Sequence, residues 1–95
     1  MQNKFPVNNS GGATATLFNT NWTGGYAWLF CTGTWGSATV VIQVNDGFSN
    51  TWITTSASLT ANGWASVEIP NGYTCQVYVS GMTATTSLEV SLSTR

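Results

Sequence analysis

The stretch WASVEIPNGYTCQVYVS, residues 64–80, decides the fold class of this chain. Before the turn PNG (70–72), apolar residues flank Glu68 on both sides. After the turn, apolar and more polar residues alternate through YTCQVYVS (73–80). A period of two is typical of β-strands that have one buried face and one wetter face. The stretch therefore predicts two half-buried strands joined by a turn.

The same pattern of short strands and turns continues through most of the chain. β-branched and aromatic residues fill the strand segments, Gly, Asn, Pro and Asp separate them, and no segment has helical periodicity. The further strands are expected at residues 13–18, 26–31, 38–45, 51–55 and 86–93. The sequence predicts an all-β protein, a single antiparallel β-sandwich that is jelly-roll-like, with seven or eight short strands.

The first residues differ from this pattern. MQNKFPVNNSGG (1–12) is polar, rich in Asn and Gly, and interrupted by Pro6. These features predict a flexible N-terminal arm over residues 1–12, followed by a β-sandwich domain over 13–95. Phe5 and Val7 are the bulky apolar side chains of the arm, and we expect them to dock on a neighbouring subunit or a shell by adding to a sheet edge. A tail without a partner is the alternative.

The chain is unusually poor in charge. It has 95 residues, of which two are basic and three acidic, and its net charge is −1. Two cations are too few to neutralise nucleic-acid phosphates or to form a polybasic membrane anchor, so neither partner is expected. The apolar run YAWLFC (26–31) is too short to span a bilayer, and the N-terminal residues lack the hydrophobic core of a signal peptide. We expect a protein made without export whose weakly charged surface favours association.

Two predicted strands are apolar on both faces. Residues 26–31 and 38–45 contain YAWLF and TVVI, whereas a two-sheet sandwich buries only one face of each sheet. The surplus face needs a cover, and we expect another copy of the chain or a larger host surface to provide it. Loops of the same chain are the alternative.

The residues that enzymes use most often are missing or poorly placed. There is no histidine, so Ser-His and Cys-His nucleophile pairs are excluded. Glu68 and Glu89 alternate with apolar positions, which is typical of solvated strand faces. The sequence predicts that the chain is not an enzyme.

No cofactor or metal site is expected either. Asp46, with Asn45 and Asn50, supplies too little charge for a tight calcium site, and the sequence is typical of a turn. Cys31 and Cys75 lie in apolar strands and form no C-x-x-C pair, so we expect free, buried thiols.

Aromatic residues are the one positive signal of a binding surface. The chain has five tryptophans, and Trp28 and Trp52 lie within strand patterns that favour a place in the core. Exposed aromatic side chains at sandwich edges bind sugars by stacking or anchor other proteins. A carbohydrate-binding, lectin-like module is therefore an alternative function. The candidate interface residues are the arm and loop side chains Phe5, Val7, Trp22, Trp35, Phe48 and Trp64.

Residues 33–52, GTWGSATVVIQVNDGFSNTW, resemble a segment of small virion proteins of tailed bacteriophages. Residues 58–81 and the closing strand SLEVSLS (87–93) are also similar, so that the resemblance covers roughly residues 13–93. Two positions depart from the family: Phe48 stands where Gly or a polar residue is frequent, and Cys75 where a charged residue is frequent.

The resemblance implies a compact β-sandwich displayed on the virion. The expected role is a head decoration (cement) protein that binds the capsid shell as an oligomer and stabilises it. Its expected partners are the major capsid protein and itself, as a homotrimer, and it would be made in the host cytoplasm. A tail- or fibre-associated virion protein is the alternative location.

Overall fold

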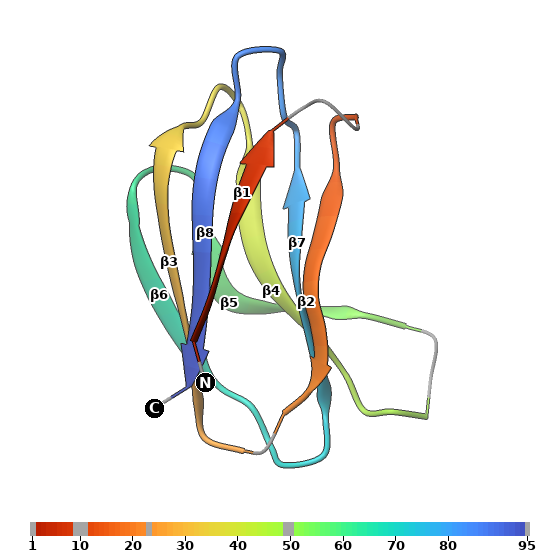
Figure 1. Cartoon of the computed structure of the whole chain (residues 1–95). Helices are drawn as coiled ribbons and strands as arrows, with labels where there is room; N and C mark the ends of the chain where they lie inside the picture. The colour runs from red at the N-terminus through yellow and green to blue at the C-terminus, as the bar shows by residue number, and fades with distance from the viewer. Residues whose placement is uncertain (1, 9–11, 23, 49–50, 95) are drawn as a thin grey trace.

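The computed structural model contains two four-stranded antiparallel sheets packed face to face (Figure 1). It describes residues 2–8, 12–22, 24–48 and 51–94. The strands are β1 (Gln2–Asn8), β2 (Ala15–Asn21), β3 (Tyr26–Thr34), β4 (Thr39–Asn45), β5 (Ile53–Leu59), β6 (Gly63–Glu68), β7 (Thr74–Ser80) and β8 (Ser87–Thr94). The predicted all-β sandwich is confirmed.

The order of the strands is that of a jelly roll. Sheet 1 has the order β1-β8-β3-β6, and sheet 2 has the order β2-β7-β4-β5. The antiparallel pairs β1·β8, β2·β7, β3·β6 and β4·β5 make the chain a long double strand that is rolled into two sheets. Segments far apart in the sequence therefore become neighbours on one sheet face.

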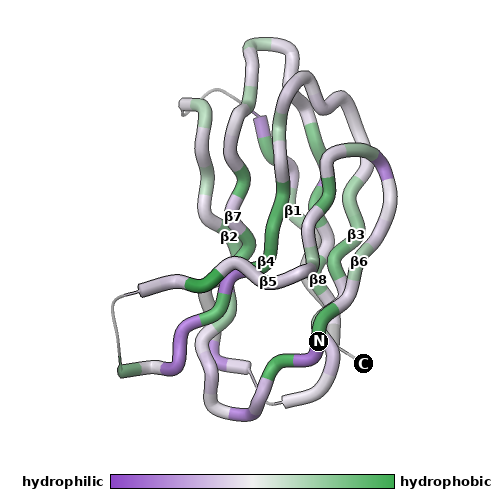
Figure 2. Tube along the Cα trace, turned by 180° about the vertical axis from the view of Figure 1, so that it is seen from behind, coloured by the Kyte–Doolittle hydropathy of each residue, from purple (hydrophilic) through white to green (hydrophobic). Residues whose placement is uncertain are grey.

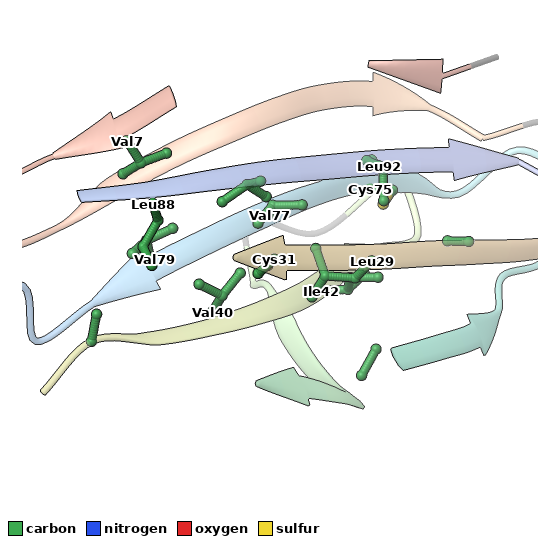
Figure 3. Close-up of a cluster of buried hydrophobic side chains, with 14 of the residues drawn as sticks. Val7, Leu29, Cys31, Val40, Ile42, Cys75, Val77, Val79, Leu88 and Leu92 are labelled. Carbon is green, nitrogen blue, oxygen red and sulfur yellow. The ribbon is translucent and has the colours of Figure 1, made fainter. Parts of the chain in front are cut away.

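The core lies between the sheets and follows the predicted alternation. In β8, Leu88, Val90 and Leu92 point inward and are at most 2% exposed, while the residues between them point outward. The same alternation occurs in β3 of the same sheet, and in β4 and β7 of the opposite sheet (Figure 3). The other core side chains of these strands are Ala27, Leu29, Cys31, Val40, Ile42, Cys75, Val77 and Val79.

The prediction of a flexible arm over residues 1–12 is wrong for Gln2–Asn8. These residues form β1, which pairs with β8 from Gln2 opposite Ser93 to Asn8 opposite Ser87. Val7 is only 5% exposed and belongs to the core. An edge strand has a neighbour on one side only, so it tolerates Pro6 and a polar outer face, and these features suggested an arm. The sandwich therefore includes β1.

Strand β5 is also longer than predicted. Its residues 56–59 were not expected in a strand because they are mostly Ser and Ala, but β5 is an edge strand and fully buries only Ala57. The Thr55 hydroxyl donates to the carbonyl oxygen of Ile42 over 2.8 Å, next to a register shift between β4 and β5. A single small buried side chain gives little periodic signal.

The outer face of sheet 2 carries a row of hydrogen-bonded polar side chains beside the pair Val41 and Tyr78. Gln76 Nε2 donates to Gln43 Oε1 over 2.8 Å, and Gln43 Nε2 donates to Thr54 Oγ1 over 3.2 Å. These bonds join β7, β4 and β5 across the sheet.

Nowhere in the described part of the chain is there a helix long and apolar enough to cross a membrane.

Candidate functional site

The connection between β4 and β5 extends away from both sheets (Figure 1). We call residues 46–48 and 51–53 the hairpin tip. Phe48 is 95% exposed and Ile53 is 59% exposed, so two bulky apolar side chains of the tip face solvent. Strongly hydrophilic and hydrophobic residues lie close together along this connection (Figure 2). Phe48 is the predicted interface residue whose exposure best fits an anchor.

Hydrogen bonds from side chains hold the backbone of the tip. Asn45 Nδ2 donates to the carbonyl oxygen of Thr51 over 3.1 Å, and Asn45 Oδ1 accepts from the amide of Gly47 over 2.7 Å. The amide of Phe48 donates to Asp46 Oδ1 over 2.9 Å. Asn and Asp commonly stabilise turns in this way, in agreement with the predicted turn. Asn50, the third residue considered for calcium, lies outside the described residues.

A small pocket lies at the base of the tip. It has a volume of about 220 Å³ and combines apolar side chains with amide, carboxylate and hydroxyl groups. Its lining residues are Val44, Asn45, Asp46, Thr51, Ile53 and Tyr73. The pocket thus lies beside the exposed side chains of Phe48 and Ile53.

The outer face of sheet 1 carries a second exposed apolar surface. Tyr26, Phe30 and Trp64 are 49%, 52% and 60% exposed. Half-buried Trp28 lies against Trp64, with 5.1 Å between the ring centroids and 31° between the ring planes. We call these four residues the aromatic face. They lie on β3 and β6, on the side of the sheet opposite the core.

Polar side chains surround the aromatic face. Ser66 on β6 and Ser93 on β8 lie directly opposite Trp28, while Trp64 and Ser91 lie opposite Phe30. Glu68 lies opposite Tyr26. Residues directly opposite each other in antiparallel strands share a sheet face. The rings are therefore bordered by short hydroxyls and a carboxylate, in contrast to the apolar inner face.

The prediction that Val7, Trp22 and Trp35 are interface residues is wrong, because these three side chains are buried in the core. Val7 packs under β8, and Trp22 is only 2% exposed. Two backbone hydrogen bonds hold Trp22 to the β6–β7 connection, from its amide to Tyr73 and from Gly72 to its carbonyl. Trp35 is 9% exposed, and its indole Nε1 donates to Asn62 Oδ1 over 2.8 Å. Loop tryptophans of a small sandwich close the ends of the core.

The other predicted contacts remain accessible. Phe48 and Trp64 are exposed, as described above. Phe5 is 51% exposed, and its ring meets Phe18 edge-on with 6.0 Å between the centroids. This pair lies where β1 and β2, the edge strands of the two sheets, approach each other. Phe5 therefore closes one open side of the sandwich.

The prediction that Trp28 belongs to the core is wrong. We also did not predict from the sequence that Tyr26 and Phe30 would lie beside it on the exposed aromatic face. The alternation in YAWLFC contained the signal, because small or aliphatic residues at 27, 29 and 31 alternate with rings at 26, 28 and 30. Aliphatic side chains pack in the thin core between two sheets, which leaves the rings outside. The second apolar face predicted for this strand is present, and about half of the surface of Tyr26 and Phe30 is exposed in the single chain; its expected cover by another copy or a host surface stays a prediction.

The cysteines are free and buried. Cys31 and Cys75 are 0% exposed and point into the core from different sheets. Burial disfavours the thiolate and raises the pKa of Cys31 to about 12 and the pKa of Cys75 to about 11. Protonated, shielded thiols are poor nucleophiles. Among the described residues, no three His, Cys, Asp or Glu side chains gather where they could hold a metal ion.

Comparison with known proteins shows the fold alone. No protein-family model matches the chain, and no curated protein matches it. The chain is similar in structure to the Yersinia pseudotuberculosis-derived mitogen (YPM), with a TM-score of 0.64 and 14% sequence identity. The match covers 99% of this chain and 83% of the mitogen chain. The two proteins share a β-sandwich architecture, and the low identity carries no conclusion about activity.

Proposed function

We propose that the chain is a structural protein of a tailed-bacteriophage particle. In this proposal it is a head decoration protein that assembles as an oligomer, binds the major capsid protein and stabilises the shell. It acts on the capsid surface after synthesis in the host cytoplasm. The resemblance of residues 33–52 and 58–81 to small virion proteins supports this role.

The observation that carries the proposal is the exposure of Phe48 on a projecting, internally braced tip. A phenylalanine that is 95% exposed gains about 1.5–3 kcal/mol if a partner buries it. The hydrogen bonds of Asn45 and Asp46 hold the tip before binding, which lowers the entropy cost of docking. Phe48 is also the position at which the chain is more apolar than the virion proteins that it resembles.

Repeated weak contacts suit attachment to a lattice. One tip buries too little surface for tight binding by itself, but an oligomer presents several tips to a shell with matching repeats. The low charge of the chain, −1 in 95 residues, gives little repulsion between copies. We expect a trimer, with three times the chain mass of 10.1 kDa.

The test uses capsids assembled without the protein, to which the purified chain is added. We expect image reconstruction to show the protein on the shell, and light scattering to show a trimer in solution. Phe48→Ser should reduce shell occupancy at least about tenfold. Trp64→Ser is the matched control, because it removes an exposed ring from the opposite surface and should leave occupancy unchanged.

Two results would contradict the proposal. A monomer that does not sediment with shells at any concentration would exclude a decoration protein. Density on the tail or on a fibre would keep the chain a virion protein but exclude the head location.

A further inference from the structure

The aromatic face is an open, elongated strip. Tyr26, Trp28 and Phe30 are every second residue of β3, so that their Cα atoms are about 7 Å apart and the row spans about 14 Å of strand. Trp64 widens the row by one strand, onto β6. All four rings belong to sheet strands rather than loops, which fixes their relative positions. Such a strip matches an extended ligand better than a single small molecule.

The nearest neighbours of the rings are short polar side chains and a carboxylate. The rows across the three strands therefore combine aromatic rings with hydrogen-bonding groups. Here Ser66 and Ser93 lie directly opposite Trp28, and Ser91 lies opposite Phe30. Short hydroxyls thus border the row of β3 rings on both of its sides, from β6 and from β8. This composition favours a ligand that offers both apolar surface and hydrogen-bonding groups.

The carboxylates beside the rings disfavour two further kinds of ligand. Glu68 lies opposite Tyr26 at one end of the ring row, and Glu89 lies opposite Thr32 beyond its other end. Both are exposed, whereas Lys4 on β1 lies opposite Ser91, one strand farther from the rings. Two copies that met through this face would bring like carboxylates together, which is unfavourable. The same carboxylates repel phosphate-rich and other acidic polymers.

We propose that the aromatic face binds a neutral, linear polysaccharide. A sugar ring has an apolar face of C–H groups, which packs on an aromatic ring and is attracted by its negative π face. Its hydroxyl groups lie at the edge of the ring, where Ser66, Ser91 and Ser93 exchange hydrogen bonds with them. The carboxylates of Glu68 and Glu89 accept hydrogen bonds from sugar hydroxyls at the two ends of the strip. No bond is made or broken.

This site lies apart from the hairpin tip and does not rest on the proposed virion role. The aromatic face belongs to β3 and β6 of sheet 1, whereas the tip joins β4 and β5 of sheet 2. Substitutions on one surface therefore test it without altering the other.

The experiment is calorimetric titration of the full chain with six-unit oligosaccharides of neutral hexoses: a glucan, a mannan and a galactan. An oligosaccharide of uronic acids is the acidic comparator. We expect at least one neutral oligosaccharide to bind with millimolar or better affinity, and the acidic one not to bind. Trp64→Ala and, separately, Phe30→Ala should each weaken binding about tenfold. Both side chains are more than half exposed, so these variants should keep the fold.

Phe48→Ala is the matched control, since it removes an exposed ring outside the aromatic face and should leave sugar binding unchanged. The proposal is overturned if no neutral oligosaccharide binds the folded protein, or if Trp64→Ala leaves binding unaltered. It is also overturned if light scattering shows that Trp64→Ala dissociates an oligomer, because a second copy then covers the face. The first two of these outcomes leave shell occupancy, which Phe48→Ser tests, unaffected.

Discussion

The indole Nε1 of Trp35 donates a hydrogen bond to Oδ1 of Asn62 over 2.8 Å. The same oxygen accepts a second hydrogen bond, from the amide of Gly33 over 2.9 Å. Asn62 lies in the β5–β6 connection, while Gly33 and Trp35 lie at the end of β3. One amide side chain therefore joins two turns and satisfies the polar end of a tryptophan that is 9% exposed.

Replacing Asn62 should destabilise the protein through these two donors. Asn62→Ala removes the acceptor and leaves the part-buried indole N–H and an amide without this partner, at a cost of about 1–3 kcal/mol. Urea unfolding followed by tryptophan fluorescence measures the change. Asn71→Ala, in the exposed β6–β7 turn, is the control and should change stability by less than about 0.5 kcal/mol. Equal effects of the two substitutions would contradict the role of Asn62.

Alanine substitutions at two glycines should distinguish the stability cost of backbone strain from that of steric overlap. Gly33 and Gly47 both have positive φ, +137° and +90°. A Cβ at Gly47 meets nothing within 4 Å, so Gly47→Ala should cost only the backbone strain of about 1–2 kcal/mol. A Cβ at Gly33 overlaps the carbonyl oxygen of Ser87 and lies 2.9 Å from Leu88 Cα.

Gly33→Ala should therefore destabilise the protein more strongly, by about 3 kcal/mol or more, since β8 must move away from β3. Thermal unfolding of the two variants side by side measures the difference. An equal decrease in stability in both variants would contradict the close approach of β3 and β8 at Gly33.

The buried thiols should make stability fall at alkaline pH. Their folded-state pKa values, about 12 for Cys31 and about 11 for Cys75, lie above the value of 9.0 for an unperturbed thiol. Above pH 9 the unfolded chain releases these protons while the folded chain keeps them. The thiol contribution is thus fully present below pH 9 and is lost as pH rises toward 11–12, by up to about 1.4 kcal/mol per pH unit for each thiol.

Denaturant unfolding between pH 7 and 11 tests this. The double variant Cys31→Ala, Cys75→Ala should be less stable at pH 7 because it loses packed sulfur atoms, but its stability should decline less steeply above pH 9. Comparison of the two proteins isolates the contribution of the thiols to the pH dependence of stability. If stability falls equally steeply with pH in both proteins, burial does not keep the thiols protonated above pH 9.

Strand β1 should be required for full stability. Deleting residues 1–8 removes the strand that pairs with one side of β8 from Ser87 to Ser93, and it uncovers the core beside Leu88 and Val90. Val7→Ala tests the same contact without removing the strand and should cost about 1–3 kcal/mol, because Val7 is 5% exposed. Ser87→Ala, exposed on neighbouring β8, should be neutral. Unchanged stability after the deletion would restore the arm interpretation.

Two tryptophans show why the binding-site residues were harder to predict than the fold. Trp22 and Trp64 both follow turn residues in the sequence and looked equivalent there. In the structure Trp22 is 2% exposed and Trp64 is 60% exposed. The difference depends on which sheet face each position occupies and on what crosses it. The β6–β7 connection is held to Trp22 by hydrogen bonds, whereas Trp64 contacts Trp28 on an open sheet face.

The sequence by itself determined the all-β class and the inward-facing residues of β7 and β8, because the period of two is a local property of an extended backbone. Only the tertiary structure decided that Gln2–Asn8 is a strand, since its partner β8 lies at the other end of the chain. It also decided that rings of β3 and β6 meet beside serines of β8, through pairings between residues far apart in sequence. Such pairings arise from packing of the whole chain, and no short stretch of sequence contains them.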